Sequence, residues 1–137
     1  MAQDAAPPHI EPLGVADPSG APGMIVVLNR LTFPEGGGAP SYTHPGATLV
    51  YVESGAFAVT LLEGAGVMTR AAVDGTPGPV EELEIGMELI LGPGDTFFED
   101  VGTIHISRNA ADGDTVVITT QLLEAGAPSL IPATPIG

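Results

Sequence analysis

The stretch SYTHPGATLVYVESG, residues 41–55, places a tyrosine and a histidine two positions apart, directly before a β-branched apolar run. Side chains alternate between the two faces of an extended chain, so Tyr42 and His44 would point the same way. Thr48 alternates in phase with both of them. We therefore expect these three side chains to share one face of a strand.

Short apolar runs separated by turn residues continue on both sides of this stretch. Nineteen glycines and 14 prolines fall between the runs, where they act as turn punctuation. Period-two alternation of apolar residues, as in 80–95, favours strand over helix. The sequence predicts about ten strands, a tight hairpin at residues 54–55 and no long helix. The predicted strand segments include 23–33, 47–54, 56–64, 66–73, 80–95, 96–100, 103–109 and 114–124. This pattern is typical of an all-β sandwich or barrel.

The 137 residues fit one domain with a substantial core. The first 22 residues are rich in Pro, Ala and Asp and lack periodicity, so we predict an irregular N-terminal arm over 1–22. The barrel is predicted to span 23–124. The remaining segment, 125–137, is apolar and Pro-rich, and it is too short to be a domain. We predict that it is a C-terminal tail.

The charge of the chain is strongly negative. Seventeen acidic residues oppose only Arg30, Arg70 and Arg108, which gives a net charge of -14. Nucleic acids and anionic membrane surfaces are bound through Lys and Arg, so both are poor partners for this chain. Cysteine is absent, which excludes disulfides and thiolate zinc sites. No apolar run approaches the roughly 18 residues of a membrane span. The start lacks the pattern of a signal peptide, so we expect the cytoplasm by default, while a mature secreted form stays open.

Two groups of residues have informative spacing. In the first, Gly36 is followed by five residues, Tyr42, one residue, His44, three residues, Thr48, six residues and Gly55. The second covers residues 94–109 and reads glycine, five residues, Asp-Val-Gly, two residues, histidine, three residues, asparagine.

These spacings resemble the two signature motifs of the cupin superfamily, whose members are small jelly-roll β-barrels. The first family motif reads Gly, five residues, His-x-His, three or four residues, Glu, six residues, Gly. The second reads Gly, five residues, Pro-x-Gly, two residues, His, three residues, Asn. Seven of the ten signature positions match in register: Gly36, His44, Gly55, Gly94, Gly102, His105 and Asn109. The resemblance covers roughly residues 24–123 and implies a cupin-type jelly-roll β-barrel.

The three positions that depart from the family pattern bear on its chemistry. Tyr42 stands where the first histidine would be, Thr48 where the glutamate would be, and Asp100 where the proline would be. In the family, the two first-motif histidines, the glutamate and the second-motif histidine bind one divalent metal inside the barrel. The resemblance therefore implies a metal site that keeps only His44 and His105 as conventional ligands.

Two imidazoles rarely hold a transition metal firmly, because protein sites usually have three or four donors. We expect one weakly held divalent transition metal (Zn, Ni, Cu, Fe or Mn) at His44 and His105, with the oxygen of Tyr42 as a third ligand. A phenol has an ordinary pKa near 10, so Tyr42 could equally be a packing and hydrogen-bonding residue. Thr48 would line the pocket and hydrogen-bond water or a ligand.

Glu99 and Asp100 are the carboxylates nearest to His105 in the sequence. Either could replace the missing glutamate, but our interpretation is that both are solvated loop acids. The sequence assigns no catalytic residue.

Two functions of different classes fit these observations. The first is a small single-domain cupin that binds a small molecule beside a weak or incomplete two-histidine metal site. The alternative is a mononuclear metal-dependent cupin enzyme, of oxygenase or isomerase type, acting on a small organic substrate. The Tyr42 and Thr48 departures favour the first, and the retention of both motif histidines keeps the second open. We also expect a homodimer with residues before Gly23 or after Glu124 at the contact, because a monomer could hardly bury its apolar arm and tail.

Overall fold

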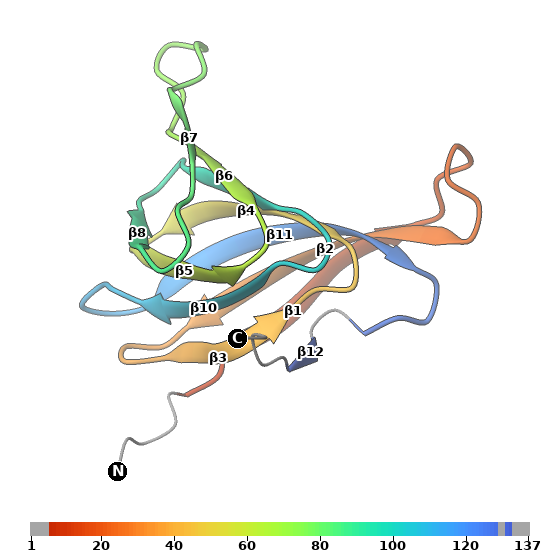
Figure 1. Ribbon diagram of the computed structural model, residues 1–137, viewed down its shortest axis with the longest axis horizontal. Helices are drawn as coiled ribbons and strands as arrows, with labels where there is room; N and C mark the ends of the chain where they lie inside the picture. Colours follow the sequence, from red (N-terminus) through yellow and green to blue (C-terminus); the bar gives the residue numbers. More distant parts are fainter. Residues whose placement is uncertain (1–5, 129–130, 133–137) are drawn as a thin grey trace.

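The computed structural model describes residues 6–128 and 131–132, and these residues form twelve strands and no helix. This confirms the all-β prediction. Figure 1 shows the strands wrapped into a barrel. They are β1 (His9–Ala16), β2 (Met24–Phe33), β3 (Gly38–Thr43), β4 (Ala47–Ser54), β5 (Phe57–Glu63), β6 (Gly66–Thr69), β7 (Val80–Glu82), β8 (Glu88–Leu91), β9 (Thr96–Glu99), β10 (Ile104–Asn109), β11 (Thr115–Glu124) and β12 (Ile131–Pro132).

Two antiparallel sheets enclose the core. One has seven strands in the order β1-β2-β11-β4-β9-β6-β7, and the other has five in the order β12-β3-β10-β5-β8. Every second residue of β11 from Thr115 to Leu123 is buried while the residues between them are not, because alternate side chains of a strand face opposite sides. Side chains from both sheets form the apolar core: Phe33, Val50, Val52, Phe57, Val59, Leu61, Met68, Leu91, Phe97 and Val117.

The connection between β4 and β5 crosses from one sheet to the other, so the predicted tight hairpin at residues 54–55 is wrong. β4 pairs with β11 and β9, whereas β5 pairs with β10 and β8. Gly55 lies at this crossing with a φ of 88°. A Cβ added there would meet both the side chain and the backbone of Thr115. Glycine tolerates this backbone conformation and this close approach, and the chain can therefore pass directly between the sheets.

The expectation that Tyr42, His44 and Thr48 share one strand face is also wrong in its geometry. Tyr42 lies in β3 of the five-stranded sheet, Thr48 lies in β4 of the seven-stranded sheet, and His44 lies in the short connection between them. Proline at position 45 cannot donate a ladder hydrogen bond, and the chain changes sheet here. Tyr42 and Thr48 are nevertheless both buried inside the barrel.

Part of the predicted irregular arm is a strand. Residues 9–16 form β1, which pairs antiparallel with β2 and has all eight residues exposed. Figure 1 shows the turn between β1 and β2 projecting from the barrel. Local composition did not reveal this strand, because pairing to the edge of β2 forms it, whereas its own residues are all exposed and show no alternation. In the predicted tail, residues 131–132 pair with β3, and residues 129–130 and 133–137 lie outside the described residues. The boundaries between arm, barrel and tail stay a prediction.

Asn109 is a structural residue that ties the connection after β2 to the connection between β10 and β11. Its Nδ2 donates to the carbonyl oxygens of Phe33, Pro34 and Gly113 at 3.0, 2.9 and 2.6 Å. Its Oδ1 accepts from the backbone of Ala111 and from the Thr115 hydroxyl at 2.8 and 2.6 Å. A buried amide with these partners fixes the ends of β2 and β10 and the turn before β11.

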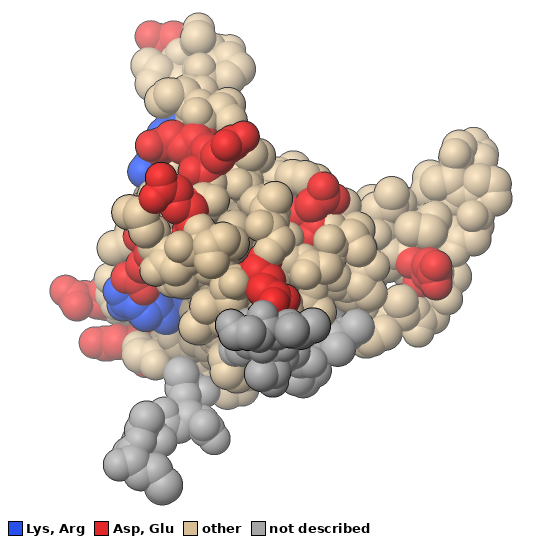
Figure 2. All heavy atoms as spheres, viewed as in Figure 1, with Lys and Arg blue, Asp and Glu red and all other residues tan. Residues whose placement is uncertain are grey.

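Among the charged side chains on the face seen in Figure 2, acidic ones are scattered over the surface and few basic ones are visible. Each arginine is paired within the chain: Arg30 with Glu11 and Glu53, Arg70 with Glu81 and Asp95, and Arg108 with Glu88. The three arginines therefore form no basic patch, because each already lies beside a carboxylate of the chain. In the part of the chain that the structure describes, no helix has the length and apolar character needed to cross a membrane.

Candidate metal centre

Three inward-facing polar residues form a row across the seven-stranded sheet. Gln121 of β11 lies directly opposite Thr48 of β4, and Thr48 lies directly opposite Glu99 of β9. All three side chains are buried. Because these strands are hydrogen-bonded neighbours, the row places an amide, a hydroxyl and a carboxylate side by side on the inner surface of the barrel.

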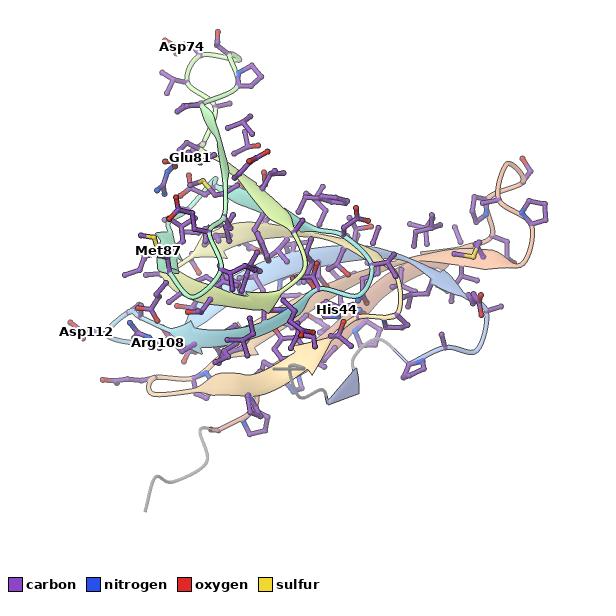
Figure 3. All side chains as sticks on the ribbon, viewed as in Figure 1. His44, Asp74, Glu81, Met87, Arg108 and Asp112 are labelled. Carbon is purple, nitrogen blue, oxygen red and sulfur yellow. The ribbon has the colours of Figure 1, made fainter. Side chains whose placement is uncertain are left out.

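Two histidines approach this row from other parts of the chain. His105 lies in β10 of the opposite sheet and is buried. His44, which follows β3, is labelled in Figure 3 amid the strands of the barrel, far from the labelled loop residues Asp74 and Asp112. The ring centroids of His44 and His105 are 5.4 Å apart. The structure thus brings together the two histidines that the sequence placed in one site.

Glu99 lies between the two histidines. Its Oε1 is 3.0 Å from Nε2 of His44, and its Oε2 is 3.2 Å from Nδ1 of His105. One donor atom from each of the three residues lies within 4.8 Å of the other two. This group could bind a metal ion, because two imidazoles and one carboxylate form a common donor set for divalent transition metals.

The donor atoms of this group are unusual for buried polar atoms. Neither carboxylate oxygen of Glu99 nor Nδ1 of His105 has a hydrogen-bond partner among the described residues. The short nitrogen–oxygen distances therefore reflect proximity without hydrogen-bond geometry. Buried polar atoms are normally hydrogen-bonded, and exceptions require an explanation such as an ion. The residues present fit a bound cation.

Burial determines the charge state of this group when no cation is bound. It raises the pKa of the Glu99 carboxyl to about 9. Burial, together with the nearby His44, lowers the pKa of His105 to about 3. Near neutral pH, Glu99 is therefore protonated and His105 is uncharged. A cation reverses this preference at Glu99, because its charge stabilises the ionised carboxylate.

The interpretation of Glu99 as a solvated loop acid is wrong. Its side chain is 1% exposed and lies in β9, beside the residue that occupies the glutamate position of the first motif, Thr48. A sequence signal was present, since Glu99 alternates in phase with buried Phe97. The pairing of β4 with β9 could not be read locally. Asp100, by contrast, is exposed, as expected.

Tyr42 contacts the site without pointing a free hydroxyl at it. Its ring centroid is 4.1 Å from that of His105, while its hydroxyl shares a hydrogen bond of 2.9 Å with the hydroxyl of Ser107. Burial raises the pKa of Tyr42 above its ordinary value, which disfavours the phenolate that a metal would need. The assignment of Tyr42 as a ligand stays a prediction.

Thr48 and Gln121 support His44 from the other side. The Thr48 hydroxyl donates to the carbonyl of Gly46 at 3.1 Å. The amide nitrogen of Gln121 is 2.9 Å from Nδ1 of His44 and 3.2 Å from Oγ1 of Thr48. Sequence reasoning missed Gln121, although its inward phase along β11 was a signal. The role of Thr48 in a ligand pocket stays a prediction.

A small cavity of about 40 Å³ lies beside the two histidines. Its lining is mainly apolar and comes from both sheets and from the segment before β1: Pro8, Ile10, Leu31, Phe33, Ala39, Tyr42, His44, Val50, Phe57, Phe97, His105, Val117 and Thr119. A cavity of this size has room for only a few water molecules, whereas pockets for drug-sized ligands measure roughly 300–1,000 Å³.

Comparison with known proteins supports the fold. No protein-family model and no curated protein matches the sequence. A cupin 2 domain-containing protein from Halorhodospira halophila is similar in structure, with a TM-score of 0.55 and 15% identity over 91% of this chain and 68% of that chain. The DMSP lyase DddQ from Ruegeria pomeroyi DSS-3 has a TM-score of 0.53 and 18% identity, over 82% of this chain and 45% of that chain. A structure of the DMSP lyases RdDddP and RnDddQII has a TM-score of 0.51 and 14% identity, over 83% of this chain and 46% of that chain.

The chain spans less than half the length of these lyases, and identities this low relate the folds only. The strand order, the two motifs at their spacing and these structural neighbours agree with one another. The chain has the cupin fold.

Proposed function

We propose that this chain is a small metal-dependent cupin that holds one divalent transition metal at His44, Glu99 and His105. The observation that carries the proposal is the convergence of three donor residues, of which the two fully buried ones, Glu99 and His105, have side-chain atoms without a hydrogen-bond partner among the described residues. Leaving a buried polar group unpaired costs roughly 1–3 kcal/mol, and more for a charged group. A cation at this position would relieve that cost.

The third donor changes which of the two functions suggested by the sequence is favoured. A two-histidine site would bind weakly, but Glu99 completes a set of two histidines and one carboxylate. Sites with this donor set and open positions are typical of non-haem Fe(II) oxygenases. When bound, such a metal supplies Lewis-acid or redox chemistry at its open positions. The enzyme hypothesis therefore gains over the binding protein, with Fe first among the candidate metals.

The surrounding residues would control access to the site. Apolar side chains from both sheets line the cavity, and the hydroxyl of Tyr42 is already bonded to Ser107. Such a wall excludes water and offers a substrate few polar partners. Because the cavity measures only about 40 Å³, a ligand larger than a few atoms requires the lining to move. Among the lining residues, Pro8 and Ile10 come from the N-terminal segment before β2.

The test is metal titration of the protein prepared without a histidine tag. Wild type should bind one Fe(II), Mn(II) or Zn(II) per chain. Glu99→Gln should weaken binding by more than the roughly 10–100-fold that changes outside the ligand shell cost. Asp100→Asn is the matched control, because Asp100 is the neighbouring carboxylate and is exposed. Equal binding by wild type and Glu99→Gln would remove Glu99 from the ligand set and leave the two-histidine site of the sequence analysis.

A second candidate function follows from the size and lining of the cavity. If wild type binds no metal, the barrel would act as a carrier of a very small apolar ligand, since dry apolar cavities bind such molecules. Xenon binding followed by NMR at Phe97 and Val117, which line the cavity, tests this function directly. Unperturbed signals from both residues would exclude it.

We also propose that the chain forms a homodimer. The outer face of the seven-stranded sheet carries exposed apolar side chains on neighbouring strands: Val26, Leu28, Leu49, Tyr51, Phe98 and Leu122. The edge strand β1 exposes three more, which are Ile10, Leu13 and Val15. Extended apolar surfaces on soluble proteins mark interaction sites. The three residues of β1 lie in the segment before Gly23 that was expected to contribute to the contact.

A further inference from the structure

Gln121 holds the position from which the ligand role of His44 is controlled. Its amide is buried, and its nitrogen lies 2.9 Å from Nδ1 of His44 and 3.2 Å from Oγ1 of Thr48. The other ring nitrogen of His44, Nε2, lies 3.0 Å from Oε1 of Glu99. The imidazole therefore has the amide on one side and the candidate metal site on the other.

Hydrogen-bond roles determine which nitrogen of His44 carries hydrogen. An amide nitrogen has two hydrogens and only donates. When it donates one to Nδ1 of His44 and one to Thr48, Nδ1 is an acceptor. A neutral imidazole carries a single hydrogen, so that hydrogen is on Nε2 and faces Glu99. This arrangement satisfies Nδ1 of His44 in the metal-free protein, but its hydrogen on Nε2 blocks the nitrogen that faces the site.

Metal ligation through Nε2 requires the opposite arrangement. The hydrogen must move to Nδ1, which then needs an acceptor. Gln121 can supply it by a half-turn of its amide, which exchanges oxygen and nitrogen with little change of shape. The Thr48 hydroxyl accepts from the amide nitrogen in the first orientation and donates to the carbonyl of Gly46. In the second orientation its single hydrogen would turn from Gly46 to the amide oxygen.

We propose that Gln121 is a positioning residue that selects the tautomer of His44, donating to Nδ1 in the metal-free protein and accepting from it when a metal is bound. Only the part of this inference that concerns the metal-bound protein rests on the proposed function. The tautomer of His44 in the metal-free protein is inferred from the contacts of the Gln121 amide alone. Gln121 thus contacts the ring nitrogen of His44 that faces away from the metal site. The first motif has no position for a residue with this role.

The test combines Zn(II) titration with NMR of protein labelled with ¹⁵N in its three histidines. Wild type should show His44 with hydrogen on Nε2 without metal and on Nδ1 with Zn(II). Gln121→Met cannot donate and accepts only weakly through its sulfur, so it should weaken Zn(II) binding by about 10–100-fold. Gln121→Glu offers an acceptor without any turn and should bind Zn(II) at least as tightly as wild type. Leu123→Met, a change at the next buried inward position of β11, is the control and should match wild type.

The outcomes separate this inference from the proposed function. Failure of wild type to bind any metal contradicts the proposed function, while the tautomer of His44 in the metal-free wild type and in Gln121→Met still decides the role of the amide. If wild type binds Zn(II) but Gln121→Met binds it equally well, Gln121 is not a positioning residue. Hydrogen on Nδ1 of His44 in the metal-free wild type overturns the inference directly.

Discussion

Replacing Glu99 by glutamine should make the metal-free protein less sensitive to rising pH. Burial raises the pKa of this carboxyl to about 9, whereas an unfolded chain has a glutamate pKa of about 4.3. Between these values the folded protein holds a proton that the unfolded chain has already lost. Stability therefore falls as pH rises through this window, because the native state binds more protons than the unfolded state. The amide of glutamine removes this titration at nearly the same shape.

The magnitude follows from linkage. When Glu99 is fully protonated in the folded state and fully ionised in the unfolded state, the two states differ by one bound proton. The free energy of unfolding then changes by at most about 1.4 kcal/mol per pH unit. His105 opposes Glu99 at lower pH, because its pKa of about 3 makes stability rise with pH until about 6.5. Above that value Glu99 acts without this compensation. Between pH 6.5 and 8.0, wild type should lose roughly 2 kcal/mol relative to Glu99→Gln.

The assay is urea unfolding of chelator-treated protein at pH 6.5 and 8.0, with Asp100→Asn as the control for loss of one negative charge. Asp100→Asn should follow wild type. A constant difference in unfolding free energy between wild type and Glu99→Gln at the two pH values would refute the buried, protonated carboxyl. Saturating Zn(II) should reverse the trend in wild type, because metal binding needs the ionised carboxylate and becomes tighter as pH rises toward 9.

Three further predictions address the fold, the site and the assembly. Asn109→Ala removes a buried amide with five hydrogen bonds, so it should destabilise the protein by about 2–4 kcal/mol in urea unfolding; a loss below about 0.5 kcal/mol would contradict its structural role. Tyr42→Phe should leave Zn(II) affinity within about threefold of wild type, because the hydroxyl of Tyr42 is hydrogen-bonded to Ser107. Changes that disturb a metal site lower affinity by about tenfold or more. A loss of that size would make Tyr42 a ligand, as the sequence suggested. Sedimentation at micromolar concentration should give the mass of a dimer, and Val15→Glu on exposed β1 should shift it toward monomer, whereas a wild-type monomer would contradict the dimer.

Much of the architecture was predictable because it is encoded locally. Alternating apolar residues identify strands such as β10 and β11, and glycines at turns separate them. The spacing of the two motifs placed His44 and His105 in one site, and the structure brings their rings together. Both signals depend on near neighbours in the chain, where the period of the side chains is set by backbone geometry.

The carboxylate of the site could not be found in the same way. The motif reports what stands at position 48, where threonine replaces glutamate. Glu99 is 51 positions away, and it becomes a neighbour of Thr48 only through the register of β4 against β9. Register depends on which strands meet and on where each turn ends. A search confined to the motif positions therefore predicted a weaker site than the structure contains.

The sequence by itself determined the fold class, the two histidines and the absence of cysteine and lysine chemistry, because periodicity, spacing and composition are properties of the chain alone. The tertiary structure decided that the chain crosses from β4 into the opposite sheet, that residues 9–16 add a strand, that Glu99 is buried, and that Gln121 supports His44 from 77 positions away. These features depend on which strands pair and in which register, and burial then sets the proton affinity of each group that the pairing brings together.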